Sequence, residues 1–84
     1  MAEVRLLTEP RNYAVVQLPE RRFPGIVFQG DSLQALIKDL EVVLVEPTAT
    51  AGVVRDVIDR LCEVRTFYEA TLERHGIELP YIRD

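Results

Sequence analysis

The amino-acid sequence predicts a single α+β domain, in which a three-stranded antiparallel β-meander is followed by two α-helices packed on one face of the sheet. Three observations support this fold class. Short runs of β-forming residues separated by turn residues fill the N-terminal third of the chain, and apolar residues then recur at helical spacing. The length of 84 residues leaves room for one domain, and a hydrophobic fraction of 48% is too high for a disordered chain.

Three segments rich in β-forming residues are predicted to be strands, at about residues 3–8, 13–18 and 26–29. In the first segment, Val4 and Leu6 alternate with Arg5 and Leu7, which is typical of a short strand. The second segment is apolar at consecutive positions, as expected for a strand covered on both faces. Short connections rich in proline and glycine favour an antiparallel meander.

The first helix is predicted at about residues 32–45. Asp31 suits the N-cap position, and Gln34 has the spacing of a capping box. Apolar residues form a stripe at i, i+3, i+4 and i+7 spacing, made of Leu33, Leu36, Ile37, Leu40, Val43 and Leu44. We expect this stripe to lie across one face of the sheet, because neither element can bury its apolar side alone.

The second helix is predicted at about residues 51–75. Its apolar stripe consists of Val53, Val54, Val57, Ile58, Leu61, Val64, Tyr68 and Leu72. Gly76 fits the left-handed position after the helix, with Ile77 packing back on Leu72. A length of about 37 Å exceeds so small a sheet, so one end of the helix is expected to overhang or to meet a second subunit. The extended tail 77–84 either docks on the core or adds an edge strand.

The residue types needed for catalysis or metal binding are scarce. His75 and Cys62 are the only histidine and cysteine, and about four helical turns separate them, so they form neither a zinc site nor a nucleophile–base pair. The segment from Gly25 to Gly30 lacks the lysine of a phosphate-binding loop. We therefore expect a non-enzymatic protein with no catalytic, cofactor-binding or metal-binding residues.

Charge and hydropathy exclude several partners. Fourteen acidic and ten basic residues give a net charge of −4, which repels nucleic-acid phosphates. The longest apolar run, Val42–Val45, is far shorter than the roughly 18 residues that span a bilayer. The N-terminus does not resemble a signal peptide, and a lone cysteine forms no internal disulfide. We expect a soluble cytoplasmic protein that binds neither nucleic acid nor membrane.

Two surfaces are candidates for binding a protein partner. The first is the loop with Arg21, Arg22 and Phe23, because arginine and aromatic residues dominate interface hot spots. The alternative is a solvated hairpin loop in which Phe23 folds back under Pro24.

The second candidate surface is an acidic ridge on the outer face of the second helix, formed by Asp56, Asp59, Glu63 and Glu73. Such a ridge attracts basic ligands and speeds their association. The alternative is a solvated face crossed by ion pairs at i,i+4 spacing, namely Arg55–Asp59, Asp56–Arg60 and Arg65–Glu69.

Residues 12–33 read NYAVVQLPERRFPGIVFQGDSL, and residues 75–81 read HGIELPY. Together these segments resemble an uncharacterised family of small bacterial proteins with Asn-Tyr-Ala-Val-Val, Leu-Pro, Phe-Pro-Gly and Gln-Gly-Asp-Ser/Thr-Leu motifs. This resemblance covers nearly the whole chain and brings no activity with it. More distantly, residues 24–36 are similar to a segment of HicB-like antitoxins, a resemblance that implies a β-β-β-α core able to cover a toxin nuclease.

The combination of small size, acidity, missing catalytic residues and an antitoxin-like segment leads to one functional hypothesis. We expect an immunity or antitoxin-type inhibitor that neutralises a bacterial toxin, such as a basic nuclease, by direct binding. The alternative is a structural or regulatory subunit that forms a homodimer through the long second helix.

Overall fold

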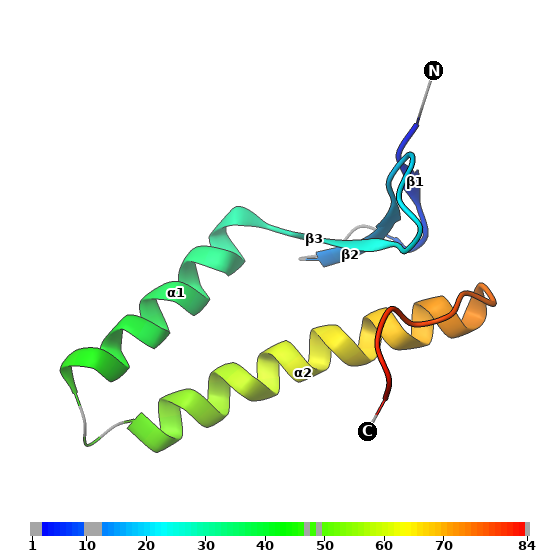
Figure 1. Cartoon of the computed structure of the whole chain (residues 1–84). Helices are drawn as coiled ribbons and strands as arrows, with labels where there is room; N and C mark the ends of the chain where they lie inside the picture. Colours follow the sequence, from blue (N-terminus) through cyan, green and yellow to red (C-terminus); the bar gives the residue numbers. More distant parts are fainter. Residues whose placement is uncertain (1–2, 10–12, 47, 49, 84) are drawn as a thin grey trace.

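The computed structural model of the chain describes residues 3–9, 13–46, 48 and 50–83. It confirms the predicted fold class: a three-stranded antiparallel sheet in the order β1-β2-β3 precedes two helices, of which the second is longer (Figure 1). The elements are β1 (Arg5–Leu6), β2 (Tyr13–Gln17), β3 (Gly25–Phe28), α1 (Gly30–Val45) and α2 (Thr50–Arg74).

The sheet is built around β2, in which Val15 pairs with Ile26 of β3. β1 is shorter than expected. The backbone N–H of Val15 donates a hydrogen bond of 3.1 Å to the Oγ1 atom of Thr8. This side-chain oxygen takes the place of the backbone carbonyl that would continue the pairing of the two strands. The core-facing residue beside β1 is Leu7, at 9% exposure, whereas Leu6 is 51% exposed. The structure therefore places Leu7, and not Leu6, on the inward side.

The C-terminal half of α2 covers one face of the sheet. Tyr68 and Leu72 form a buried cluster with Leu7 and Val15. The hydroxyl group of Tyr68 donates a hydrogen bond of 2.8 Å to the carbonyl oxygen of Pro24 and thereby links the helix to the β2–β3 loop. This small cluster joins elements from both ends of the chain.

The expectation that the first helix lies across the sheet was wrong. α1 packs instead against the N-terminal half of α2, and the two helices form a hairpin that projects from the sheet (Figure 1). The physical reason is width. Three strands about 4.8 Å apart span about 10 Å, which is close to the diameter of one helix. Since α2 already covers the width of one face, α1 finds no room beside it there, and it packs against α2 itself.

α1 also begins earlier than expected. The first α-helical hydrogen bond runs from the N–H of Leu33 to the carbonyl oxygen of Gln29, at 3.0 Å, and Gln29 is the N-cap residue without a side-chain cap. Asp31 therefore lies inside the first turn, where its Oδ1 atom accepts a hydrogen bond from the N–H of Ser32. Its negative charge there still complements the helix dipole.

The end of α2 agrees with the prediction. Gly76 has a φ of 66° and donates to the carbonyl oxygen of Glu73, while Ile77 donates to that of Leu72 at 2.9 Å, which is the Schellman pattern. The tail then turns back along α2 (Figure 1), and Ile77 and Leu79 pack on the buried cluster. Of the two alternatives for the tail, docking on the core is the one observed.

The molecule is elongated, with extents of 49 × 30 × 20 Å. Its radius of gyration is 15.4 Å, whereas a compact domain of this length has roughly 12 Å. Its accessible surface is 6543 Å², compared with roughly 5,100 Å² for a compact monomer of this mass. The projecting helical hairpin contributes to both differences, because it adds length and has few buried residues.

We expect Gly76→Ala to lower the free energy of unfolding by about 1 kcal/mol, because an alanine is strained at positive φ. A Cβ atom at Gly76 would meet nothing within 4 Å, so the cost is conformational and not steric. The matched control is Gly52→Ala in the first turn of α2, where a Cβ atom is equally free and should stabilise by about 0.5 kcal/mol. Urea denaturation measures the free energy of unfolding of both variants. Changes of the same sign would contradict the left-handed conformation assigned to Gly76.

We expect Tyr68→Phe to destabilise the protein by about 1 kcal/mol at neutral pH, because the hydrogen bond to Pro24 is lost. Burial raises the pKa of Tyr68. An unfolded tyrosine loses its proton near pH 10, so wild-type stability should fall as the pH rises above about 10. The difference in the free energy of unfolding between wild type and Tyr68→Phe should therefore be smaller at about pH 10.5 than at neutral pH. A constant difference would show that Tyr68 is not protected in the fold.

Candidate interaction surface

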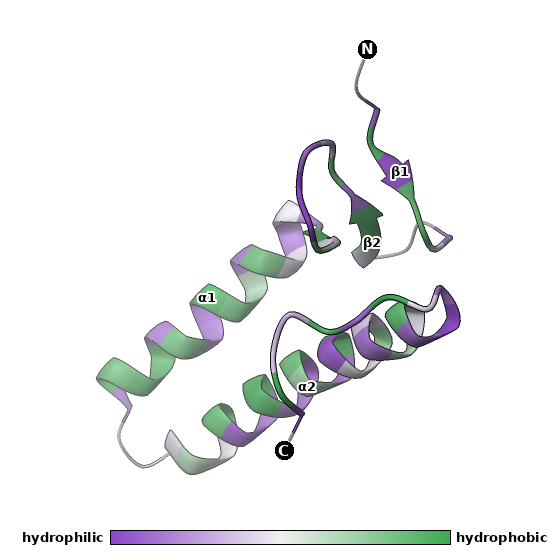
Figure 2. Ribbon diagram, turned by 45° about the vertical axis from the view of Figure 1, so that its right-hand side comes forward, coloured by the Kyte–Doolittle hydropathy of each residue, from purple (hydrophilic) through white to green (hydrophobic). Residues whose placement is uncertain are grey.

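Both helices of the hairpin expose large apolar side chains. We call the following six residues the apolar side: Leu33, Ile37, Leu40, Leu44, Ile58 and Leu61. The first four belong to α1 and the last two to α2. Of the sixteen residues of α1, all within the described part of the chain, Leu36 alone is buried. Most of the apolar stripe that was expected to be buried is therefore exposed. Figure 2 shows that hydrophobic residues recur along the whole length of α1.

The exposed apolar residues of α1 and those of α2 lie on the same side of the hairpin. At about 100° per residue, the exposed residues of α1 are rotated by about 40–100° from the buried residue Leu36. Ile58 and Leu61 are rotated by a similar angle, in the same sense, from the buried residue Val57. Because the two helices run in opposite directions (Figure 1), equal rotations from their contact seam lead to the same side.

The apolar side continues toward the sheet. A groove of about 450 Å³ lies between β3 and α2, with Ile26, Leu61 and Tyr68 in its lining. Tyr81 of the docked tail also lines this groove. Burial and a hydrogen bond to Glu69 raise the pKa of Tyr81. One apolar surface thus extends from the helical hairpin to the C-terminal tail.

The hairpin is held together by a charged cluster. Arg60 of α2 forms ion pairs with Asp39 of α1 and, at 3.0 Å, with Asp56 of its own helix. The hydrogen bond that Arg60 donates to Asp39 raises the pKa of Arg60, and the neighbouring Asp56 adds to the shift. Beside this cluster a cleft of about 230 Å³ opens toward the sheet, and Glu63 lines it. The charged cluster and the apolar side therefore lie on different sides of the hairpin.

The predicted acidic ridge contains two residues with partners inside the chain. Asp56 pairs with Arg60, and Asp59 lies 4.0 Å from Arg55, so two of the three expected i,i+4 pairs are present. The third is replaced by an ion pair of 3.4 Å between Glu69 and Arg83 of the tail. Within the described residues, Glu63 and Glu73 form no ion pair.

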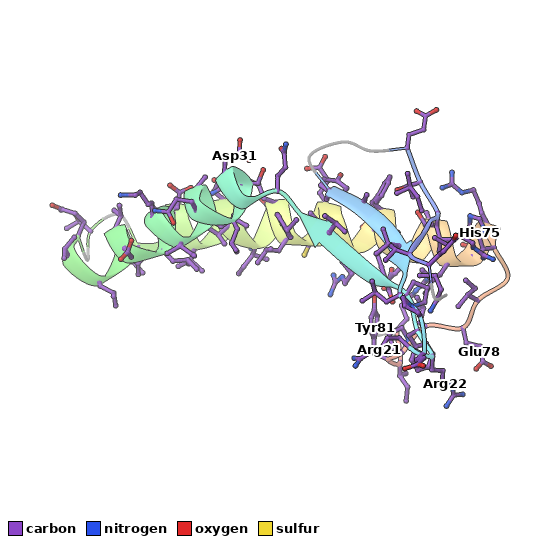
Figure 3. All side chains as sticks on the ribbon, turned by 90° about the horizontal axis from the view of Figure 1, so that it is seen from above. Arg21, Arg22, Asp31, His75, Glu78 and Tyr81 are labelled. Carbon is purple, nitrogen blue, oxygen red and sulfur yellow. The ribbon has the colours of Figure 1, made fainter. Side chains whose placement is uncertain are left out.

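The predicted loop surface lies at the sheet end of the molecule. Arg21 and Arg22 are exposed, and both line a cavity of about 580 Å³ next to Pro80 of the tail. The guanidinium group of Arg22 stands 4.9 Å from the ring centre of Phe23 in a cation–π contact. Phe23 is half-buried. Figure 3 shows both arginines at the same end as Tyr81, away from Asp31 at the start of α1.

No cluster of reactive groups appears among the described residues. No group of three His, Cys, Asp or Glu side chains there is placed to hold a metal ion. Cys62 is half-buried and accepts a long hydrogen bond of 3.5 Å from Arg65, and His75 is exposed at the end of α2 (Figure 3). None of the described helices has the length and hydropathy of a membrane span.

Comparison with known proteins identifies the family. A family model described as a family of unknown function, DUF6959, matches residues 1–81. The chain belongs to this family. No curated protein and no solved structure matches it. The DUF6959 match agrees with the resemblance to an uncharacterised family, and it covers both the sheet and the helical hairpin.

The apolar side was missed as a surface because its residues follow the same spacing as a buried stripe. One signal could have revealed it. α1 is also apolar at Val42 and Val45, outside the stripe, so its apolar arc is wider than one neighbouring helix can cover. The predicted overhang of the second helix was a further indication of an incompletely covered hairpin.

We expect Arg60→Ala to lower the melting temperature, because Asp39 and Asp56 would then face each other without a cation. The loss should be larger in low salt, since salt screens the repulsion between the carboxylates. Arg55→Ala is the matched control, because it removes an exposed pair at 4.0 Å that contributes little. Thermal unfolding followed by circular dichroism measures both. Equal shifts would contradict the role given to Arg60.

Proposed function

We propose that this member of DUF6959 is a non-enzymatic binding protein that docks another polypeptide on its apolar side. The observation that carries the proposal is that the chain leaves this side uncovered. Leu40 of α1 and Ile58 of the N-terminal half of α2 are both 45% exposed, and Leu44 is 83% exposed. Contiguous apolar surface of this kind is typical of protein interfaces.

Energetics support the proposal. A helix of about 16 residues is marginal in water unless packing stabilises it. α1 has a single buried residue, Leu36, and it contacts α2, with which Asp39 also forms an ion pair. A partner on the apolar side would bury residues of both helices together and would stabilise the hairpin in the form described.

The charge pattern favours a polypeptide over a lipid surface. Helices that lie on membranes carry lysine and arginine on their polar face, where they contact anionic headgroups. α1 carries Lys38 together with three acidic residues, Asp31, Asp39 and Glu41. An anionic membrane would repel this helix, whereas an apolar protein surface would not.

The inhibitor hypothesis is one form of this proposal, in which the partner is a basic toxin domain. Asp56, Asp59 and Glu63 stand on neighbouring turns of α2 and are exposed. An acidic surface beside an apolar one supports fast association with a basic partner. If this form is correct, Glu63→Lys should slow association with the toxin and weaken its salt dependence.

The test compares two substitutions on the same helix. Ile37 on the apolar side is 43% exposed and Val42 on another side of α1 is 40% exposed. We expect Ile37→Glu to abolish capture of the partner polypeptide from the protein's own cells, because a charge would be buried in the interface. Val42→Glu should leave capture unchanged. Mass spectrometry of the captured material identifies the partner, and its affinity for each purified variant is then measured.

Equal capture by wild type and both variants would exclude the apolar side as the binding surface. Far-UV circular dichroism of each variant verifies that the helices remain folded. Equal loss with Val42→Glu would show a general effect on α1 and would also contradict the proposal.

A further inference from the structure

We propose that the polypeptide docked on the apolar side is a second copy of this chain, so that two α1–α2 hairpins form a symmetric four-helix bundle. This inference rests on the proposed function and names its partner. It is drawn from three properties of the described residues, namely the surface area of the monomer, the distribution of charge and the symmetry of the hairpin.

The first property is area. The accessible surface exceeds that of a compact monomer of this mass by roughly 1,400 Å². A stable protein–protein interface buries roughly 800 Å² on each partner. A standard interface formed by the hairpin would therefore remove more than half of this excess surface from each copy.

The second property is charge. Two copies with a net charge of −4 repel each other unless their acidic groups are kept apart. All six residues of the apolar side are uncharged, while Asp39, Asp56 and Glu63 are placed on the opposite side of the contact seam. The apolar side is thus a part of the helical hairpin on which two copies can meet with little repulsion.

The third property is symmetry. A two-fold interface brings the same surface of two copies together, so that surface must be complementary to itself. A layer of two antiparallel helices with apolar residues on one side meets this condition, and two such layers form a four-helix bundle. Ile37 and Leu40 lie near the middle of α1, so they would lie near the two-fold axis.

Pairing also gives a reason for the overhang of α2. The C-terminal half of this helix supports the sheet through Tyr68 and Leu72. The N-terminal half, with Ile58 and Leu61, has α1 on one side and exposed apolar surface on another. A second hairpin would complete the core of that half.

Sedimentation equilibrium of the purified full chain tests the proposal, from micromolar to several hundred micromolar concentrations. We expect wild type to have twice the mass of one chain over most of this range. Ile37→Glu should weaken self-association by at least about 100-fold, whereas Val42→Glu should change it by less than about threefold. If Ile37→Glu proves unfolded, Ile37→Ala replaces it, with an expected weakening of about tenfold.

A wild-type chain that is monomeric at the highest concentration would overturn the inference, as would equal weakening by Val42→Glu. The capture experiment separates this failure from that of the proposed function. A monomer whose capture of a different protein is lost with Ile37→Glu would exclude the second copy and leave the apolar side as a binding surface. A monomer with capture unaffected by either variant would contradict both.

Discussion

The width of the sheet is the constraint on which the rest of the structure depends. Three strands are about as wide as one helix, and the C-terminal half of α2 covers that width through Tyr68 and Leu72. α1 follows β3 directly and finds no room on the face that α2 covers, and it packs against the other half of α2. The elongated shape and the exposed apolar side both follow from this division of α2.

The two halves of α2 are stabilised in different ways. The half under the sheet has a buried cluster, a hydrogen bond from Tyr68 to Pro24 and the docked tail. The half beside α1 has few buried residues and the ion pairs of Arg60. Exposed or half-exposed ion pairs contribute little to stability by themselves. The hairpin is therefore the part of the fold that gains most from a partner, and this links its packing to its proposed function.

Much of the secondary structure could be predicted from the sequence, because it depends on near neighbours along the chain. The helical spacing of apolar residues predicted both helices, and Gly76 predicted the Schellman end of α2. The inward face of the first strand could not be predicted in the same way. Leu6 and Leu7 are adjacent and equally apolar, and only the pairing of Leu7 with Val15 decides which one is buried.

The sequence by itself determined the fold class, the order of the elements and the end of the long helix, because local propensities and turn residues act over a few positions. Only the tertiary structure decided which surface of α1 is covered, that Arg60 joins Asp39 and Asp56, and that Glu69 pairs with Arg83 and not with Arg65. Periodicity shows that a helix has an apolar face but not which neighbour covers it. That outcome depends on how many helices fit on one face of the sheet, which is a property of the assembled strands.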